Sequence, residues 1–487
     1  MTPEEYLSLD AWAAAERVHR GEVTPLELAE AAIERIEALN PRLNAVVEKG
    51  FAAARETARR ADRTRPLAGV PFLAKDMNIE VQGLHLTSSC QWLAQLPPAD
   101  EDAPLASRWR LAGLTILGRT NTPEFAGDFV TEPTWRGATA NPWNTARTPG
   151  GSSGGAAAAV AAGMVPIAHA TDSGGSIRVP ASACGLVGLK PSRGWVPVGP
   201  HHDELAGGLD CEHVLSRSVR DSALMLDLTL GPEPTSRYAL RRPEHSFASA
   251  LNRSIPPLKI GVALRTPGGA YADPEVGAAV QSAAAMLERA GHRISEFHYP
   301  RSAAHIAAPA ALIWMTATAE EVAFFRGVTG KAPERHELEA LTWACVELGE
   351  RSSAVEYQRA RRALSGASRD MALAFGGIDM LLLPTTACTA VPTGSIDGRT
   401  EKFTLERWNE DSYRFAPYTE LFNVTGQPAV SLPLAESRDG LPIGVQLVAA
   451  AGEDAALLSL AAWFERELPW SGRLRALQQR LLSGNAS

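Results

Sequence analysis

The sequence contains only five cysteines in 487 residues, and no two of them form a CxxC pair. Sparse, unpaired cysteines argue against a disulfide framework and indicate reduced, buried thiols in an intracellular protein. Positive charge is not in excess either, because the net charge is −8. A protein that binds nucleic acid would need a basic face. We therefore expect a cytoplasmic protein that makes no contact with nucleic acid.

Long apolar runs are also missing. The longest one, between Gly154 and Ala168, is rich in glycine and alanine and contains Pro166, so it is a poor candidate for a membrane span. The opening residues MTPEEYLSLD have neither the basic nor the apolar region of a secretory signal. We expect no membrane association. With 45% hydrophobic residues, the chain can instead bury a large core.

Short apolar runs alternate with helical patterns along the chain. This alternation predicts an α/β fold, with one large domain over residues 1–487 and a mixed, largely parallel central sheet covered by helices. The expected strands lie within residues 69–76, 114–121, 165–172, 258–264, 379–385, 428–434 and 442–450.

Two sections are expected to be mainly helical. In the first, residues 1–65, Thr24 and Glu27 form a T-x-x-E capping box that starts a helix, and Asn40-Pro41 should end it. The second, about residues 300–375, could form a lid over a cleft or simply peripheral helices. The pattern does not decide between these two interpretations.

Two stretches are unusually rich in glycine and serine: RTPGGSSGG, which begins at Arg147, and TDSGGSIRVP, which begins at Thr171. The first lacks the lysine of a phosphate-binding loop. It matches the G-x-S-x-G nucleophile elbow, but NPWNTARTP precedes it where that motif needs a buried strand. Both motifs are therefore excluded, and a third interpretation combines Ser152 and Ser176 with a lysine.

Lys75 follows the apolar run PFLA. Burial at the end of a strand would lower the pKa of its amine from about 10.4 and make the neutral amine a general base. Alternatively, the side chain extends to solvent and has no special task. On this residue alone, the second explanation is favoured.

The combination of motifs resembles the amidase signature family. PFLAKD, TPGGSSGG and TDSGGSIRVPASACGLVGLKPSRG carry the resemblance, and GRTNTPEF, GATANPWN, FNVTGQPAVSLPL and PIGVQLVA extend it from about residue 5 to residue 470. Within the family, TEPTWRGATANPWN and the closing motifs look most like the branch of nylon-oligomer cyclic-dimer hydrolases and acylamidases.

The resemblance implies hydrolysis of an amide through a seryl acyl-enzyme. Ser176 matches the family's nucleophile, Ser152 its bridging serine, held after a cis peptide bond, and Lys75 its catalytic lysine. The lysine, when neutral, would remove a proton from the bridging serine, which in turn would deprotonate the nucleophile. We expect no cofactor and no metal.

The glycines before the nucleophile would let main-chain N–H groups approach the substrate oxygen. The N–H groups of Ser173, Gly174 and Gly175, with that of the nucleophile, would form an oxyanion hole. Asp172 and Arg178 match an acid and a base that the family pairs across this loop. We interpret this pair as a clamp on the loop.

The substrate pocket is less well marked. Phe125 and Gly127 fall where the family lines its pocket, and Gly151 is expected there beside the bridging serine. Trp314 is better explained as a core residue. HHDEL at 201–205 lacks further ligand spacing for a metal and indicates a surface loop, and HELEA ends without the second histidine of a zinc motif.

Two other functions stay open. The chain could be the A-type subunit of a tRNA-dependent amidotransferase, which releases ammonia from glutamine with the help of partner subunits. It could also be a non-catalytic binding protein, although the complete lysine–serine–serine set argues against that. The expected partner is a small-molecule or oligomeric amide, and the resemblance suggests a homodimer.

Overall fold

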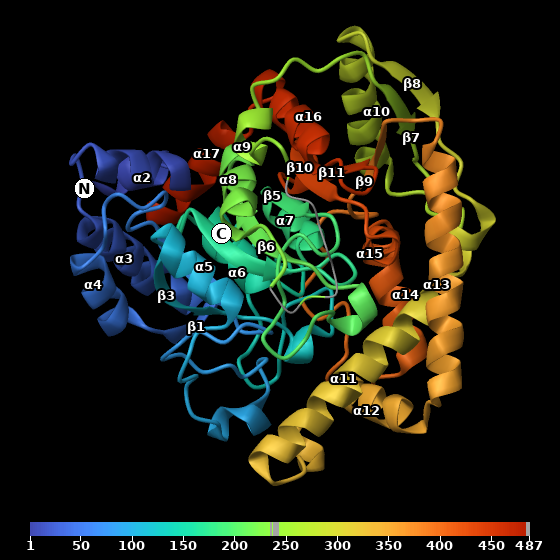
Figure 1. Ribbon diagram of the computed structural model, residues 1–487, viewed down its shortest axis with the longest axis horizontal. Helices are drawn as coiled ribbons and strands as arrows, with labels where there is room; N and C mark the ends of the chain where they lie inside the picture. The colour runs from blue at the N-terminus through green and yellow to red at the C-terminus, as the bar shows by residue number, and fades with distance from the viewer. Residues whose placement is uncertain (234–235, 237–242, 484–487) are drawn as a thin grey trace.

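The apolar runs of the sequence form one continuous sheet. In the computed structural model, which describes residues 1–233, 236 and 243–483, its strands follow the order β1-β3-β2-β4-β6-β5-β10-β11-β9-β7-β8 (Figure 1). The strands are β1 (Val46–Lys49), β2 (Pro71–Lys75), β3 (Thr115–Thr120), β4 (Ile167–Thr171), β5 (Val187–Lys190), β6 (Glu212–Ser216), β7 (Lys259–Val262), β8 (Arg293–Glu296), β9 (Met380–Pro384), β10 (Ala429–Glu436) and β11 (Pro442–Ala449).

The mixed sheet is confirmed, but it is less parallel than expected. Parallel pairing is confined to β3-β2-β4 and to β9-β7-β8, and the other pairs within the described residues are antiparallel. The pair β10 and β11 shows one reason for the antiparallel pairing, because only residues 437–441 join the two strands. So short a connection cannot make the crossover that a parallel pair requires.

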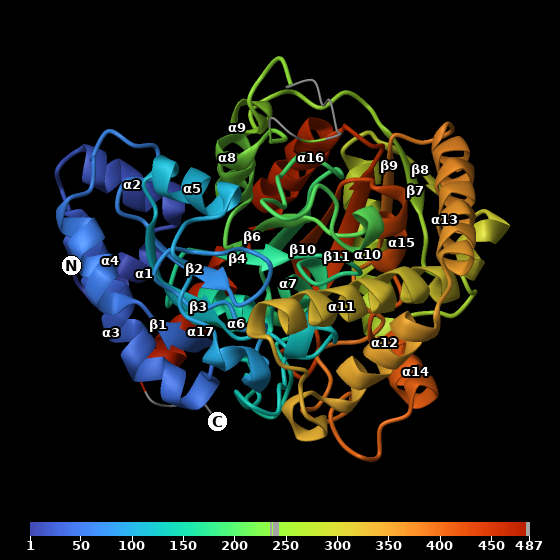
Figure 2. The ribbon, with the colours of Figure 1, turned by 60° about the horizontal axis from the view of Figure 1, so that its bottom comes forward.

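Helices cover the sheet in two groups (Figures 1 and 2). In one group α6 and α7 contact each other and the strands, and in the other α8 and α16 do so. The helices are α1 (Pro3–Ser8), α2 (Ala11–His19), α3 (Pro25–Leu43), α4 (Phe51–Arg59), α5 (Pro104–Ala112), α6 (Gly154–Ala161), α7 (Arg178–Cys184), α8 (Val219–Thr229), α9 (Phe247–Ala250), α10 (Pro274–Arg289), α11 (Ala307–Thr329), α12 (Ala340–Arg351), α13 (Ala354–Phe375), α14 (Leu405–Phe415), α15 (Glu420–Thr425), α16 (Asp454–Glu467) and α17 (Ser471–Leu482).

The α6 helix lies at the centre of the molecule, and every residue of it is buried. It contains only glycine, alanine and one valine. Such small side chains let the helix backbone approach the sheet closely, since the Cβ of any larger residue at Gly155 would lie 2.4 Å from the backbone nitrogen of Asn121. The low side-chain volume of GGAAAAVA is therefore a packing requirement.

The second helical section lies on the side of the molecule opposite the first four helices (Figures 1 and 2). It consists of α11, α12 and α13, of which α11 contacts the other two. The α11 helix also contacts the short turn Ala206–Gly208, so it reaches from the periphery to the loops at the sheet edge.

The sheet brings the chemical groups together at one edge. Strands β2 and β4 are parallel neighbours, so their carboxyl ends, Lys75 and Thr171, reach the same edge. The neighbouring strand β6 runs antiparallel, with Glu212 at its start paired to Thr171. A lysine, a threonine and a glutamate that lie far apart in the sequence therefore meet in one place.

The two ends predicted for α3 were only partly correct. The capping box of Thr24 and Glu27 is confirmed. The expected stop at Asn40-Pro41 is wrong, because α3 continues through Pro41 to Leu43 and ends where Asn44 takes a left-handed conformation, with φ +47°. The Asn40 side chain stabilises this end, because it accepts hydrogen bonds from the N–H groups of Ala45 and Val46.

Four of the five cysteines are buried as expected, and Cys388 is half-buried. None of the helices in the described residues combines the length and the apolar character that crossing a bilayer would require.

Candidate active site

The amine of Lys75 is enclosed in the protein. The side chain has no exposed surface, and Nζ lies 2.7 Å from the Ser152 Oγ and 2.7 Å from the Thr171 Oγ1. Burial lowers the pKa of Lys75 to about 8, although the carboxylates of Asp210 and Glu212 partly oppose this shift. A minor fraction of the amine is therefore neutral near neutral pH, and this fraction, which can accept a proton, grows as the pH rises.

A buried polar network lies behind this lysine. The His169 Nδ1 accepts a hydrogen bond from the Lys75 main-chain N–H (3.2 Å), so its proton is on Nε2, which donates to Glu212 (2.6 Å). Burial and the nearby lysine keep the pKa of His169 well below its usual value, so the ring is neutral. Asn78 donates to both Asp210 (2.9 Å) and Glu212 (2.8 Å). Two acidic groups thus face the lysine from one side.

The two serines lie on adjoining loops. Ser152 is fully buried and follows a cis peptide bond from Gly151, and Ser176 is 7% exposed. The loops are joined where the main-chain N–H of Ser153 donates to the Ser176 carbonyl (3.3 Å). Ser153 stands at the N-cap of α6, but its hydroxyl makes no cap and bonds instead to Thr171 on β4. The Ser153 hydroxyl therefore ties the loop that contains Ser152 to the edge of the sheet.

The loop before Ser176 presents free donors. Within the described part of the chain, the main-chain N–H groups of residues 173–176 donate to no protein group. Gly175 has a φ of +147°, and a Cβ at this position would lie 2.3 Å from the Thr419 Oγ1. Such consecutive unpaired N–H groups can stabilise a negative oxygen, as an oxyanion hole does.

An ion pair between Asp172 and Arg178 joins the two ends of this loop. The Asp172 carboxylate accepts from the Arg178 guanidinium (2.8 and 2.9 Å) and from the Ile177 main-chain N–H (3.1 Å). Neither charged side chain has any exposed surface. Burial alone would raise the pKa of Asp172, but Arg178 and Asn423 hold it below the usual value. The pair is part of the scaffold of the loop and does not reach into a cavity.

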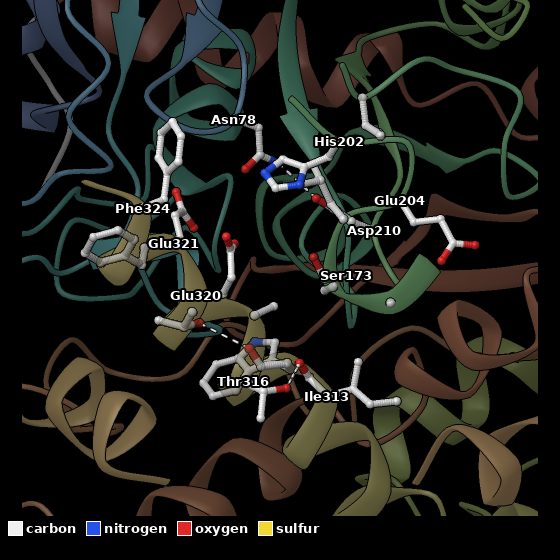
Figure 3. A pocket seen from close by; sticks show the side chains of 18 of the residues that line it. Asn78, Ser173, His202, Glu204, Asp210, Ile313, Thr316, Glu320, Glu321 and Phe324 are labelled. Carbon is white, nitrogen blue, oxygen red and sulfur yellow. Dashed lines mark hydrogen bonds between the residues drawn. The ribbon is translucent and has the colours of Figure 1, made fainter. Parts of the chain in front are cut away.

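A cavity of about 560 Å³ opens in front of Ser173 and Thr171 (Figure 3). Its carboxyl groups come from the loops and from α11, and Figure 3 shows Glu320 and Glu321 of α11 facing the side where Asp210 lies. No lysine or arginine lines it among the described residues. This is the larger of two spaces that meet at the free N–H groups.

A second, smaller cavity of about 90 Å³ contains Ser176 itself. Ser173, Ala126 and Trp314 line both cavities, so the loop that carries Ser173 and Ser176 lies at the boundary between them. Trp314 packs against the core cluster of Met315, Leu341 and Cys345, as the core interpretation expects, but it also lines the cavities. Its indole is half-buried and stacks on Trp408, with ring centroids 5.8 Å apart, in the wall of the smaller cavity.

The residues predicted for the substrate pocket are placed differently. Phe125 lines the larger cavity and Gly127 the smaller one. Gly151 lines neither, so its expected place in the pocket needs correction. A Cβ on Gly151 would lie 2.7 Å from the main-chain oxygen of Asp128, and the glycine is needed for this close backbone contact.

The histidines of HHDEL are exposed and lie outside any helix or strand, as the surface-loop interpretation expects, and they also line the larger cavity. His201 approaches Glu80 (3.2 Å), and His202 also lines the cavity (Figure 3). No group of three or more histidine, cysteine or acidic side chains suited to a metal ion is found among residues 1–233, 236 and 243–483.

Several groups at the site were missed by the sequence reasoning. His169 is a polar residue inside the apolar strand β4, and that contrast is a signal that could have indicated it; Glu212 stands at the start of β6, where no such contrast marks it. Asp128 and Trp408 approach Ser176 from distant parts of the chain, and no local pattern marks them.

The sequence and the fold are similar to those of known amide-hydrolysing proteins. The family model described as "Amidase" matches residues 27–458. The 6-aminohexanoate-cyclic-dimer hydrolase of Paenarthrobacter ureafaciens is 38% identical, covering 95% of this chain and 96% of its own. A solved structure of 6-aminohexanoate cyclic dimer hydrolase superposes with a TM-score of 0.92 at 37% identity, over 97% of this chain and 99% of that one. The A-type subunit of the glutamyl-tRNA(Gln) amidotransferase of Synechococcus sp. (strain CC9605) is 34% identical over 94% of this chain and 96% of its own.

Proposed function

This chain belongs to the amidase family and is an amide-hydrolysing enzyme, and from that premise we propose that Ser176 is its nucleophile, activated through Ser152 by a neutral Lys75. The observation that supports the proposal most is the 2.7 Å distance between the buried amine and the Ser152 hydroxyl. A lysine whose pKa lies near 8 is partly neutral near neutral pH, and the neutral amine can accept the Ser152 proton.

The reaction then proceeds in two halves. Lys75 accepts the Ser152 proton, Ser152 accepts the Ser176 proton, and the Ser176 oxygen forms a bond to the amide carbonyl carbon. The free N–H groups of residues 173–176 stabilise the oxyanion. When the C–N bond breaks, the proton returns through Ser152 to the leaving amine. Water then attacks the acyl-enzyme ester and restores the Ser176 hydroxyl.

The two cavities suggest how a substrate lies. The acyl group stays attached to Ser176 after the amine leaves, and the smaller cavity, which contains Ser176, suits it. The larger cavity extends to the exposed Glu320 on α11 and suits the leaving amine. We therefore assign the acyl side to the smaller cavity and the amine side to the larger one.

The substrate class is taken from the relatives as a proposal. Two of them are named for the cyclic dimer of 6-aminohexanoate, and we propose cyclic or linear amides of comparable size as substrates. The alternative is glutamine hydrolysis within an amidotransferase, because one relative is the A-type subunit of such an enzyme. The two cyclic-dimer hydrolases are 38% identical to this chain and the amidotransferase subunit 34%, which favours the hydrolase.

The test uses the purified chain without partners. We expect hydrolysis of 6-aminohexanoate cyclic dimer, a linear aliphatic amide or an anilide, covalent labelling by a fluorophosphonate probe, and loss of both in Ser176→Ala. Full activity in Ser176→Ala would refute the assignment of the nucleophile. Activity on glutamine that requires an added partner would favour the amidotransferase alternative.

Three further expectations remain predictions: a homodimer, a cytoplasmic location and no binding of nucleic acid. Light scattering at several protein concentrations tests the first. Fractionation of the native host tests the second. A gel-shift assay with single- and double-stranded oligonucleotides tests the third.

A further inference from the structure

The smaller cavity contains two carboxyl groups with no countercharge. Asp128 is 9% exposed, and its carboxyl oxygens accept from the Phe129 main-chain N–H (2.7 Å) and the Trp408 indole N–H (3.2 Å). The Glu420 carboxyl accepts from the Tyr413 hydroxyl (2.6 Å). All of these donors are neutral, and no lysine, arginine or histidine lines the cavity among the described residues.

Buried carboxyl groups normally have a cationic partner, because removing a charge from water is costly. Burial raises the pKa of Asp128 to about 8 and that of Glu420 to about 7. Both groups therefore hold a proton for much of the time when the cavity is empty. A cation that entered the cavity would stabilise both carboxylates and complete the missing pairing.

A third polar group in the same cavity lacks a partner. Ser412 is 1% exposed and lines the cavity, and its Oγ makes no hydrogen bond within the described part of the chain. A buried hydroxyl without a partner is uncommon, since most buried polar atoms are hydrogen-bonded. With Asp128 and Glu420 it offers three acceptors from three residues. A primary ammonium group has three N–H donors to match them.

The remaining walls suit a cation and a short carbon chain. Trp314 and Trp408 contribute indole rings, whose π faces attract cations, and Leu405 and Met315 are apolar. The cavity measures about 90 Å³, and a water molecule needs roughly 10–15 Å³ by such a measure. It therefore has room for a chain of several atoms beside Ser176, which also lines it.

We infer that this cavity is an acyl subsite that selects acyl groups ending in a protonated primary amine, with Asp128, Glu420 and Ser412 as its hydrogen-bond acceptors. The inference rests on the proposed function, because it requires the acyl group on Ser176 to extend into the cavity. The substrate class is therefore an amide of a short ω-amino acid, attacked at the carbonyl of the amino-acyl part.

The test compares two anilides that differ only at the chain end. 4-Aminobutanoyl p-nitroanilide ends in an ammonium group, and pentanoyl p-nitroanilide ends in a methyl group of similar size. For wild type we expect kcat/KM to favour the amino compound by on the order of 10- to 100-fold. Equal values, or a preference for the methyl compound, would overturn the inference while leaving amide hydrolysis intact. Cleavage of neither anilide, nor of any amide in the panel above, would count against the proposed function instead.

Variants test which side chains cause the preference for the amino compound. Asp128→Asn should reduce the ratio of the two kcat/KM values to near unity, and Glu420→Gln should reduce it in the same direction. Asp411→Asn is the matched control. Asp411 lies on α14, pairs with Arg414 (3.2 Å) and does not line the cavity, so this variant should leave the ratio unchanged. A ratio unchanged in both cavity variants would refute the assignment of the acceptors.

A measurement on the wild type alone covers the case in which a variant does not fold. Butylammonium should inhibit hydrolysis of pentanoyl p-nitroanilide competitively, and butan-1-ol should inhibit at least 10-fold more weakly. Equal inhibition by the amine and the alcohol would show that the cavity does not recognise the charge, and the inference would fall.

Discussion

The Nζ of Lys75 lies between two hydroxyl oxygens, those of Ser152 and Thr171, at 2.7 Å from each. A neutral amine has one lone pair and two protons, so it can accept from one hydroxyl and donate to the other at the same time. The Thr171 hydroxyl lies on β4, and its position gives the lysine a fixed direction toward Ser152. Positioning of the base thus depends on the pairing of β2 with β4.

This arrangement predicts a pH dependence. The pKa of Lys75 is lowered to about 8, so the fraction of neutral amine grows as the pH rises through about 8. We expect kcat/KM to increase over that range and then level off. Lys75→Ala should lose on the order of 10²–10⁴ in kcat/KM together with this pH limb. A pH-independent rate in wild type, or equal rates in the two proteins, would contradict the role of the base.

Asp210→Asn should shift the rise of kcat/KM to lower pH. The Asp210 carboxylate opposes the effect of burial on Lys75, so removing its negative charge makes the protonated amine less stable and lowers the pKa of Lys75 further. The measurement is the kcat/KM profile of the variant from acidic to alkaline pH. Asp439→Asn, an exposed residue remote from the site, is the control and should leave the limb in place. A shift to higher pH in Asp210→Asn would show that the sign of this interaction is wrong.

Most of the predicted strands are buried runs in which apolar residues predominate, although the short buried strand β5 was missed. PFLAK, TILGRT and PIGVQLVA all form strands within the predicted ranges. The β6 strand, EHVLS, was missed because a glutamate and a histidine occupy its first two positions. Both residues are buried; Glu212 bonds to His169 at the site, and His213 bonds to Ser222 of α8.

The candidate site was predictable only where its residues form local motifs. Lys75, Ser152 and Ser176 each stand in a short stretch that resembles the family. Gly127, in the wall of the smaller cavity, was predicted from the family motif. Trp314, Trp408 and Glu420 were not, because they come from separate segments that no local motif marks. Only the packing of α11 and α14 against the nucleophile loop brings them together.

Gly175→Ala should damage catalysis more than folding. The new Cβ would lie 2.3 Å from the Thr419 Oγ1, at a φ of +147° that side chains rarely allow. The loop would shift and at least one N–H donor would move away from the oxyanion, which costs on the order of 10²–10³ in kcat. Gly277→Ala on α10 is the control, since a Cβ there meets nothing within 4 Å. Unchanged kcat in Gly175→Ala would mean that the loop does not hold the oxyanion.

Arg178→Met should destabilise the protein strongly, because it leaves Asp172 as a buried charge without its partner. The Arg178 guanidinium also donates to Gln446 (2.7 Å) and Asn423 (2.6 Å), so several acceptors lose a donor at once. We expect the free energy of unfolding to fall by about 3–5 kcal/mol, measured by chemical denaturation. Arg407→Met removes an exposed partner of Asp411, and such surface pairs contribute only about 0–1 kcal/mol. The comparison sets a buried arginine with several acceptors against an exposed arginine that pairs with one aspartate. Similar losses in the two variants would show that the clamp does not stabilise the nucleophile loop.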